Sequence, residues 1–197
     1  MQLGDLMTFK SGEVVTRLAQ RSPLKTTSGD YRLYDMSVFA SESGETGRND
    51  EPRYLDMADG LVPMPADSVV LAIIGGRMTL SKGVDPDGKP YILDSNFSWI
   101  RTDETRLDAG YLVYWFNESA DAKRLIHAAV TGTTMPKLSL KSITEFEINL
   151  PPIKVQQKIG RLYQLMRQRR QLIQRREQLF TELTLASLAD ATHKEKN

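Results

Sequence analysis

Short apolar runs separated by polar turns fill the first hundred residues of the chain. The turns are rich in glycine, aspartate and serine, and the runs between them have the length of strands. The run SVVLAIIGG (68–76) is apolar at consecutive positions, so we expect it to be a central strand covered on both faces. Further strands are predicted at LGDLMTFK (3–10), YRLYDM (31–36), PYIL (90–93) and FSWIR (97–101), and an exposed loop is predicted at residues 40–51.

A helical period follows these strands. Asp108 is a suitable N-cap for a helix through AGYLVYWFNES (109–119), in which large apolar residues recur at a spacing of four. A second helix is predicted at AKRLIHAAV (122–130), ending at Gly132. This half of the chain therefore adds helices to the strands.

The next segment predicts a change from a compact domain to an extended helix. Ser139 is expected to cap a short turn, and the strand FEINL (146–150) is expected to end at Pro151 and Pro152. Residues 154–189 are strong helix formers with Gly160 as their one internal glycine. At ~1.5 Å per residue they predict a rod of roughly 50 Å.

Apolar residues repeat every seven positions along this predicted helix. Such a repeat is typical of a coiled-coil seam, although Arg169 and Arg176 occupy two positions that are usually apolar. The alternative is one amphipathic helix lying along its own domain. The residues predicted to contact a partner helix are Ile159, Leu162, Met166, Ile173, Phe180 and Leu183, and an adjacent series comprises Leu165, Leu172, Leu179 and Ala186.

Composition narrows the class of protein. The chain has 197 residues, 40% apolar and 26% charged, and no apolar run approaches the ~20 residues that span a bilayer. No secretory signal is visible in MQLGDLMTFKSGE (1–13), and the sequence contains no cysteine. We expect a cytoplasmic protein without contact to a membrane.

Charge is distributed unevenly along the chain. Residues 1–154 carry 17 Lys and Arg against 21 Asp and Glu, a net charge of −4, whereas residues 155–197 carry 9 against 4, a net charge of +5. Proteins that bind nucleic acid usually present a basic surface, because neutralising phosphates releases counterions. DNA binding by residues 1–154 would therefore depend on local clusters of cations.

The known signatures of catalysis are missing from the sequence. GGRMTLSKG (75–83) has glycines and a lysine in the wrong order for a phosphate-binding loop, and NLPPI (149–153) lacks the aromatic residue of a methyltransferase N-P-P motif. His127 and His193 have no ligand-spaced carboxylates, and Asp35, Glu42 and Asp94 lack the spacing of a nuclease. We expect no cofactor, no metal and no catalytic residue.

Two segments combine cations with hydroxyl groups. Guanidinium, ammonium and hydroxyl groups suit phosphate oxygens and the edges of guanine. Both segments could equally be a solvated hairpin tip or a set of helix caps. The candidate DNA-contacting residues are Arg77, Thr79, Ser81 and Lys82 in the first segment and Thr133, Thr134 and Lys137 in the second.

Taken in order, these pieces resemble type I restriction-modification DNA specificity subunits. The resemblance rests on LGDLMTFKSG, SVVLAIIGG, SNFSWIRTD, GYLVYWFNES, TGTTMPKLSLKSI and INLPPIKVQQKI, and it extends from Leu3 to about Leu188. Lys154 and Val155 depart from the acidic residues common in the family after the proline pair, whereas Gln156 and Ile159 match.

The resemblance implies an α+β fold with a β-rich, irregular DNA target-recognition domain (1–152), a long coiled-coil-forming spacer helix (153–190) and a polar tail (191–197). It implies a non-catalytic, half-length specificity subunit for defence against foreign DNA, which forms a homodimer and reads a bipartite palindrome. Double-stranded DNA and methyltransferase subunits are the implied partners, with a restriction subunit as a further candidate. The alternative is an adaptor that binds methyltransferase or other defence subunits through its helix without reading DNA.

Overall fold

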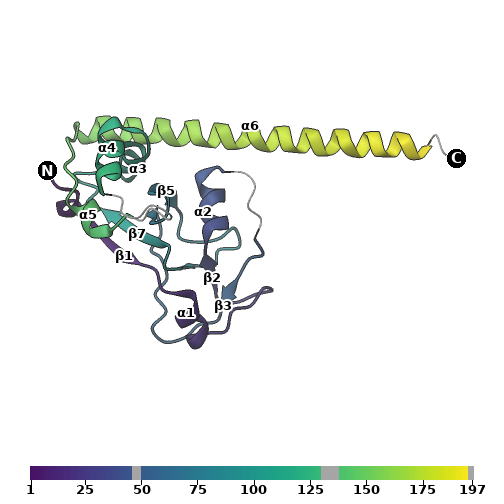
Figure 1. The fold of residues 1–197 in the computed structure, drawn as a ribbon, viewed down its shortest axis with the longest axis horizontal. Coiled ribbons are helices and arrows are strands. Elements are labelled where there is room, and N and C mark those ends of the chain that lie inside the picture. The colour runs from purple at the N-terminus through teal and green to yellow at the C-terminus, as the bar shows by residue number, and fades with distance from the viewer. Residues whose placement is uncertain (46–49, 130–137, 195–197) are drawn as a thin grey trace.

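The computed structural model describes residues 1–45, 50–129 and 138–194. It has a β-rich globular part from which one long helix projects (Figure 1). The elements, in chain order, are a 3-10 turn (Leu3–Asp5), β1 (Met7–Ser11), α1 (Val15–Arg21), β2 (Tyr31–Tyr34), α2 (Met36–Ser43), β3 (Tyr54–Leu55), β4 (Ser68–Ala72), β5 (Arg77–Ser81), β6 (Tyr91–Leu93), β7 (Phe97–Thr102), α3 (Ala109–Glu118), α4 (Ala120–Ala129), α5 (Leu140–Thr144) and α6 (Ile153–Lys194). The predicted α+β class is confirmed.

Two sheets form the centre of the globular part. Four antiparallel strands have the order β1-β7-β4-β5, and the smaller sheet has the order β3-β2-β6, in which β2 and β6 run parallel. β4 lies inside the larger sheet and all five of its residues are buried, as its continuous apolar run predicts. Successive side chains of a strand face opposite sides of the sheet, so β4 contributes to two cores.

Each face of the larger sheet is covered by different elements. Val69 and Leu71 pack with α3 and α5, and Ile159 of α6 joins the edge of this cluster. Val70 and Ala72 pack on the other face with α2 and strands of the smaller sheet. A third cluster joins α1 to the smaller sheet.

Helix caps account for where several helices begin. The Asp108 carboxylate accepts a hydrogen bond from the Tyr111 N–H at 2.8 Å, and the Ser139 hydroxyl accepts one from the Ser142 N–H at 3.0 Å. Both caps are as predicted. α6 begins at Ile153, directly after the two prolines, and continues for 42 residues.

Three local predictions are wrong. Residues 40–43 belong to α2 and not to an exposed loop, because Phe39 and Ala40 are buried and Asp35 caps the helix. The segment 146–150 is no strand, since it has one isolated bridge between Gln2 and Glu147. Residues 77–81 form strand β5 instead of a loop.

Candidate nucleic-acid interface

The first predicted DNA-contacting segment is a β-hairpin. Gly75 and Gly76 have φ angles of 84° and 55°, which glycine adopts without strain, and they turn the chain back so that β5 pairs with β4. Arg77 begins β5 and Lys82 follows its end. At ~3.3 Å per residue these two cations lie roughly 16 Å apart along the strand.

The hairpin separates the four predicted side chains by their surroundings. Arg77 and Lys82 are exposed, whereas Thr79 is 1% and Ser81 4% exposed. Both hydroxyls donate to Glu42, from Thr79 to the backbone carbonyl at 3.2 Å and from Ser81 to the carboxylate at 2.7 Å. Arg77 forms an ion pair with Glu45. The fold thus does not gather the four residues into one exposed cluster.

The second predicted segment cannot be placed in the same way. Thr133, Thr134 and Lys137 lie outside the described residues. Their contact with DNA therefore stays a prediction.

Glu42 joins three elements beneath the hairpin. Its carboxylate, at the end of α2, accepts hydrogen bonds from Tyr34 of β2 at 2.5 Å and from Ser81 of β5 at 2.7 Å. Burial raises the pKa of this carboxyl group, and the two hydrogen bonds lower it in part. Glu42 therefore connects the two sheets through α2.

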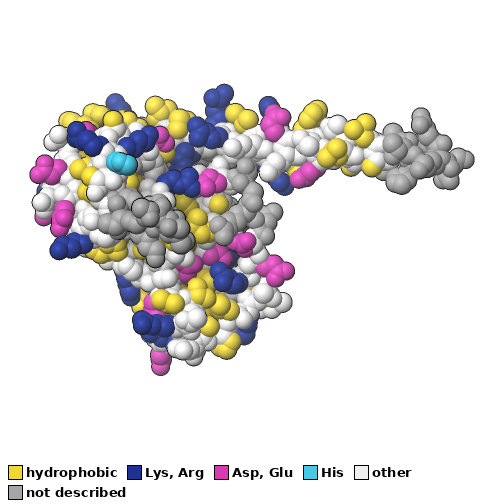
Figure 2. Space-filling model, viewed as in Figure 1, with side chains coloured by type: hydrophobic (Ala, Val, Ile, Leu, Met, Phe, Trp, Pro, Cys, Tyr) yellow, Lys and Arg dark blue, Asp and Glu magenta, His cyan; other side chains and the backbone are white. Residues whose placement is uncertain are grey.

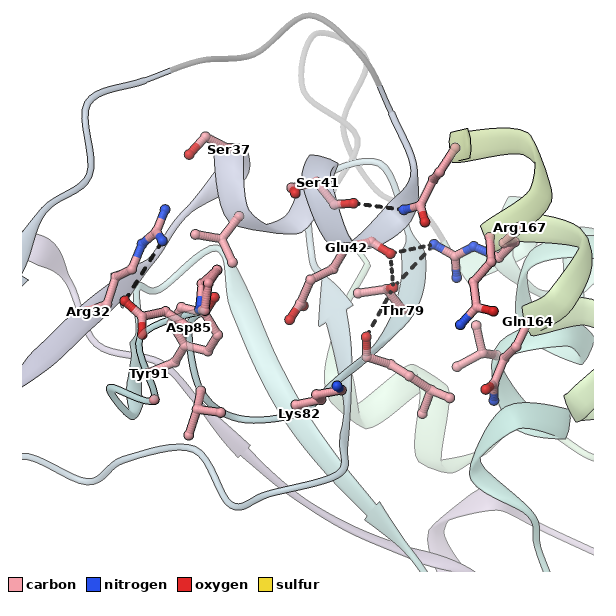
Figure 3. A pocket seen from close by; sticks show the side chains of 18 of the residues that line it. Arg32, Ser37, Ser41, Glu42, Thr79, Lys82, Asp85, Tyr91, Gln164 and Arg167 are labelled. Carbon is pink, nitrogen blue, oxygen red and sulfur yellow. Dashed lines mark hydrogen bonds and ion pairs between the residues drawn. The ribbon is translucent and has the colours of Figure 1, made fainter. Parts of the chain in front are cut away.

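A cleft of about 780 Å³ opens beside Glu42, between α2, β5 and α6 (Figure 3). Lys82 lies on its rim and has no ion pair with any described residue. Arg32 faces the buried carboxylate of Asp85, with 3.9 Å between Nη1 and Oδ2. Three glutamines of α6 line the opposite side: Gln164, Gln168 and Gln171. The cleft holds charges of both signs.

Gln156 fixes the beginning of α6. Its side chain is 1% exposed and donates to the carbonyls of Arg106 and Pro151, at 3.0 and 2.8 Å, while its own carbonyl accepts from the Asp108 N–H at 3.0 Å. The side-chain nitrogen and oxygen of this buried amide are therefore both hydrogen-bonded.

Two glycines allow α3 and α6 to touch. A Cβ atom on Gly160 would lie 2.5 Å from Asp108 Oδ1 and 2.6 Å from the Tyr111 nitrogen, and one on Gly110 would lie 3.2 Å from the Gly160 Cα. Neither position has room for a side chain. This close crossing sets the direction in which α6 leaves the domain.

Polar contacts continue along α6 beyond the crossing. The Tyr163 hydroxyl donates to Glu118 of α3 at 2.8 Å. Arg167 donates to the Thr79 hydroxyl at 3.2 Å and to the Glu42 carbonyl at 3.3 Å, and Gln171 donates to the Ser41 carbonyl at 2.9 Å (Figure 3). α6 is therefore held by α3, β5 and α2 in turn.

Most of the apolar stripe of α6 is exposed. Figure 2 shows hydrophobic side chains along the projecting helix. Ile159 is partly buried against the core, but the other predicted partner-contacting residues are exposed. The exposed fractions are 69% for Leu162, 44% for Met166, 40% for Ile173, 66% for Phe180 and 66% for Leu183.

Other ionisable groups have structural partners. Asp35 caps α2 and pairs with Arg53 at 3.2 Å, and Asp94 accepts a hydrogen bond from the Asn96 N–H. Within the described ranges, no group of three or more His, Asp or Glu side chains could hold a metal ion. None of the helices in the described part of the chain, α6 included, combines the length and apolarity needed to cross a bilayer.

The comparisons with known proteins agree with this arrangement. The model of the type I restriction modification DNA specificity domain matches residues 1–178. The chain belongs to this specificity-domain family. A search of curated proteins finds no match.

Solved structures of type I specificity subunits have a similar fold. The S subunit from M. genitalium shares 18% identity over 86% of this chain and 38% of its own, with a TM-score of 0.53. The HsdS subunit from Thermoanaerobacter tengcongensis is 13% identical in sequence, and the match covers 95% of this chain and 41% of that subunit, with a TM-score of 0.53. A third solved structure concerns complex assembly and conformational transition of the type I R-M system. It is 14% identical in sequence, and the match covers 95% of this chain and 42% of that chain, with a TM-score of 0.54. The chain thus spans about two fifths of the length of these specificity-domain relatives.

Proposed function

We propose that the protein reads DNA sequence for a type I restriction-modification assembly. The observation that carries this proposal is the family match, which covers the β-rich domain together with the first part of α6. The buried pairing of Gln156 and the glycine crossing support a fixed relation between these two parts. A domain held rigidly on a rod can present its DNA-contacting residues at a defined distance from a second domain.

In this proposal the exposed cations of the hairpin, Arg77 and Lys82, contact DNA. Thr79 and Ser81 hold β5 on Glu42, because their hydroxyls are buried and already bonded. Thr133, Thr134 and Lys137 grip the DNA backbone. The proposal thereby retains two of the four hairpin residues as direct contacts.

The second half of the recognition unit is a second copy of the chain, paired with the first through α6. An exposed stripe of large apolar side chains on a projecting helix favours a partner, since soluble monomers rarely leave such a surface in water. An antiparallel pair of helices would carry one recognition domain at each end. Two identical domains related by a two-fold axis would read an interrupted palindrome.

Catalysis belongs to partner subunits in this proposal. The chain alone neither methylates nor cleaves DNA, and methylation requires a methyltransferase subunit. Mapping of methylated bases in cells with and without the gene tests whether the protein directs methylation. We expect one bipartite sequence to lose its methylation in the cells without the gene. An unchanged methylation map would contradict the proposal.

An adaptor that does not read DNA is the second candidate. The observation in its favour is that carboxylates neutralise several cations of the globular part: Arg21 pairs with Glu13, Lys25 with Asp56, Arg53 with Asp35 and Arg77 with Glu45. Loss of methylation without measurable DNA binding by the assembled complex would favour the adaptor.

A further inference from the structure

A second cavity lies on the other side of Arg167, between the globular part and α6. It encloses about 460 Å³ and is bounded by the end of α2, the start of β5, the end of α3 and the middle of α6. Figure 2 shows Lys and Arg side chains gathered where α6 meets the globular part. The cavity thus lies where α2, β5 and α3, the elements that hold α6, meet this helix.

Three guanidinium groups line this cavity, those of Arg77, Arg167 and Arg170. Its two carboxylates are already engaged, Glu45 with Arg77 and Glu118 with the Tyr163 hydroxyl. Burial lowers the pKa of Arg167 and the positive charge of Arg77 also lowers it, whereas Tyr163, Glu45 and Glu118 raise it. With three guanidinium groups against two carboxylates, the described lining carries one more positive charge than negative charges.

Two polar atoms of the wall are buried without a hydrogen-bond partner among the described residues. They are the Ser43 hydroxyl oxygen and the Gln174 side-chain oxygen. A buried polar atom without a partner is uncommon in a folded protein and can mark the place of a bound ion. Ser43 can donate to an acceptor oxygen, and rotation of the Gln174 amide by half a turn presents its NH₂ group to the same oxygen.

A ligand for this site needs negative charge and several acceptor oxygens. A phosphate group has both, and guanidinium groups bind its oxygens through paired N–H donors. The edge of a base lies on the floor of a DNA groove and cannot enter a cavity walled by helices, whereas a phosphodiester projects from the duplex. The chemistry of the lining thus favours a phosphodiester over a base.

We infer that this cavity is a phosphate site in which Arg77, Arg167 and Arg170 hold a backbone phosphodiester of bound DNA. The inference rests on the proposed DNA-reading function and gives Arg77 a phosphate as its contact in place of guanine. Glu45 forms an ion pair with Arg77 when DNA is absent, and its carboxylate competes with the phosphate for the guanidinium group. DNA bound here touches both the recognition domain and α6.

Three variants test the site, with binding of a duplex measured by fluorescence anisotropy at several salt concentrations. Arg170→Gln should weaken binding about 3- to 10-fold for every sequence and reduce the salt slope by about 1. Glu45→Gln should tighten binding, because it frees Arg77, and a misfolded variant could not produce such a gain. Arg175→Gln is the matched control, since Arg175 is exposed on the same helix and does not line the cavity.

Equal losses in the Arg170 and Arg175 variants, or no gain in the Glu45 variant, would overturn the inference. Inorganic phosphate provides an arm without DNA, read as protection against thermal unfolding. Phosphate protection with the same order of variants but no duplex binding would support the anion site while refuting the DNA-reading function. Duplex binding that none of the variants changes would refute the site and leave that function standing.

Discussion

At the scale of single residues, Gly160 decides how closely α6 approaches the domain. Alanine in place of glycine inside a helix usually stabilises it by about 1 kcal/mol. Here an added Cβ would lie 2.5 Å from Asp108 Oδ1, 2.6 Å from the Tyr111 nitrogen and 2.7 Å from the Gly110 carbonyl carbon, mostly against backbone that cannot move aside. We expect Gly160→Ala to destabilise the protein by about 1–3 kcal/mol, as overpacking does.

Urea unfolding checks this expectation. Gln157→Ala, in an exposed position of the same helix, is the control and should change stability little. A Gly160→Ala variant as stable as the control, or more stable than the natural protein, would show that α3 and α6 do not cross at this point.

A second residue, Glu42, predicts a dependence of stability on pH. Burial raises its pKa above the ordinary value, so the folded state binds a proton more tightly than the unfolded state does. The stability contributed by this group is then highest below the ordinary Glu pKa of about 4.3 and falls as pH rises toward the folded pKa. Glutamine does not titrate, and its amide can still bond with Tyr34 and Ser81.

We therefore expect Glu42→Gln to improve stability, relative to the natural protein, more at about pH 7 than at about pH 4. Urea unfolding of both proteins at the two pH values measures this difference. Other titrating groups are common to both proteins and cancel. A difference that is equal at both pH values, or larger in acid, would contradict the buried environment of Glu42.

At the scale of elements, the sequence predicts the helices and strands that have a regular apolar pattern. It does not predict the elements that bury polar side chains. β4 and α3 follow from a continuous apolar run and from a cap followed by spaced aromatic residues. β5 is hidden because Thr79 and Ser81, although polar, face the interior and bond to Glu42. α2 is hidden because its last residues are polar and resemble a loop.

The candidate site was predictable only in part for the same reason. Arg77 and Lys82 stand out in the sequence as cations after an apolar strand. The bonds that position them join residues far apart in the chain: Ser81 and Glu42 are separated by 39 positions, and Arg167 and Thr79 by 88. Such pairings arise from the packing of α2 and α6 on the sheet, for which the sequence carries no local signal.

The long helix permits a sharp prediction about pairing. In an antiparallel pair centred near Gln171, the seven-residue series face one another in layers, with Leu162 of one copy opposite Phe180 of the other. Arg169 and Arg176 would face Ile173 and Met166, and their long side chains can extend along the seam to water. The chain contains no cysteine, so any disulfide that forms must join the introduced cysteines and shows which positions of the two helices are close.

We expect Leu162→Cys and Phe180→Cys to form a disulfide only when the two variants are mixed. In the antiparallel pair, like positions lie roughly 27 Å apart, because 18 residues separate them at ~1.5 Å each. Crosslinking of each variant with itself would indicate parallel helices. Ile173→Asp should give monomers in light scattering, and Gln178→Asp, on the opposite side of the helix, should not.

At the scale of the whole molecule, the symmetry of the proposed dimer determines the form of the DNA site. In the proposed dimer, a two-fold axis through the paired helices would relate the two recognition domains, so their half-sites would be inverted repeats. α6 has 42 residues, a length of roughly 60 Å at ~1.5 Å per residue. Half-site centres are therefore expected to lie more than one turn of B-DNA, ~34 Å, apart.

Selection of binding sequences from a random duplex library tests whether the protein reads a bipartite palindrome. The selection uses the protein assembled with its methyltransferase subunit, and sequencing of the bound fraction reads the result. We expect two inverted half-sites separated by a fixed number of unspecified base pairs. A single asymmetric half-site, or a bound fraction with no preferred sequence, would contradict it.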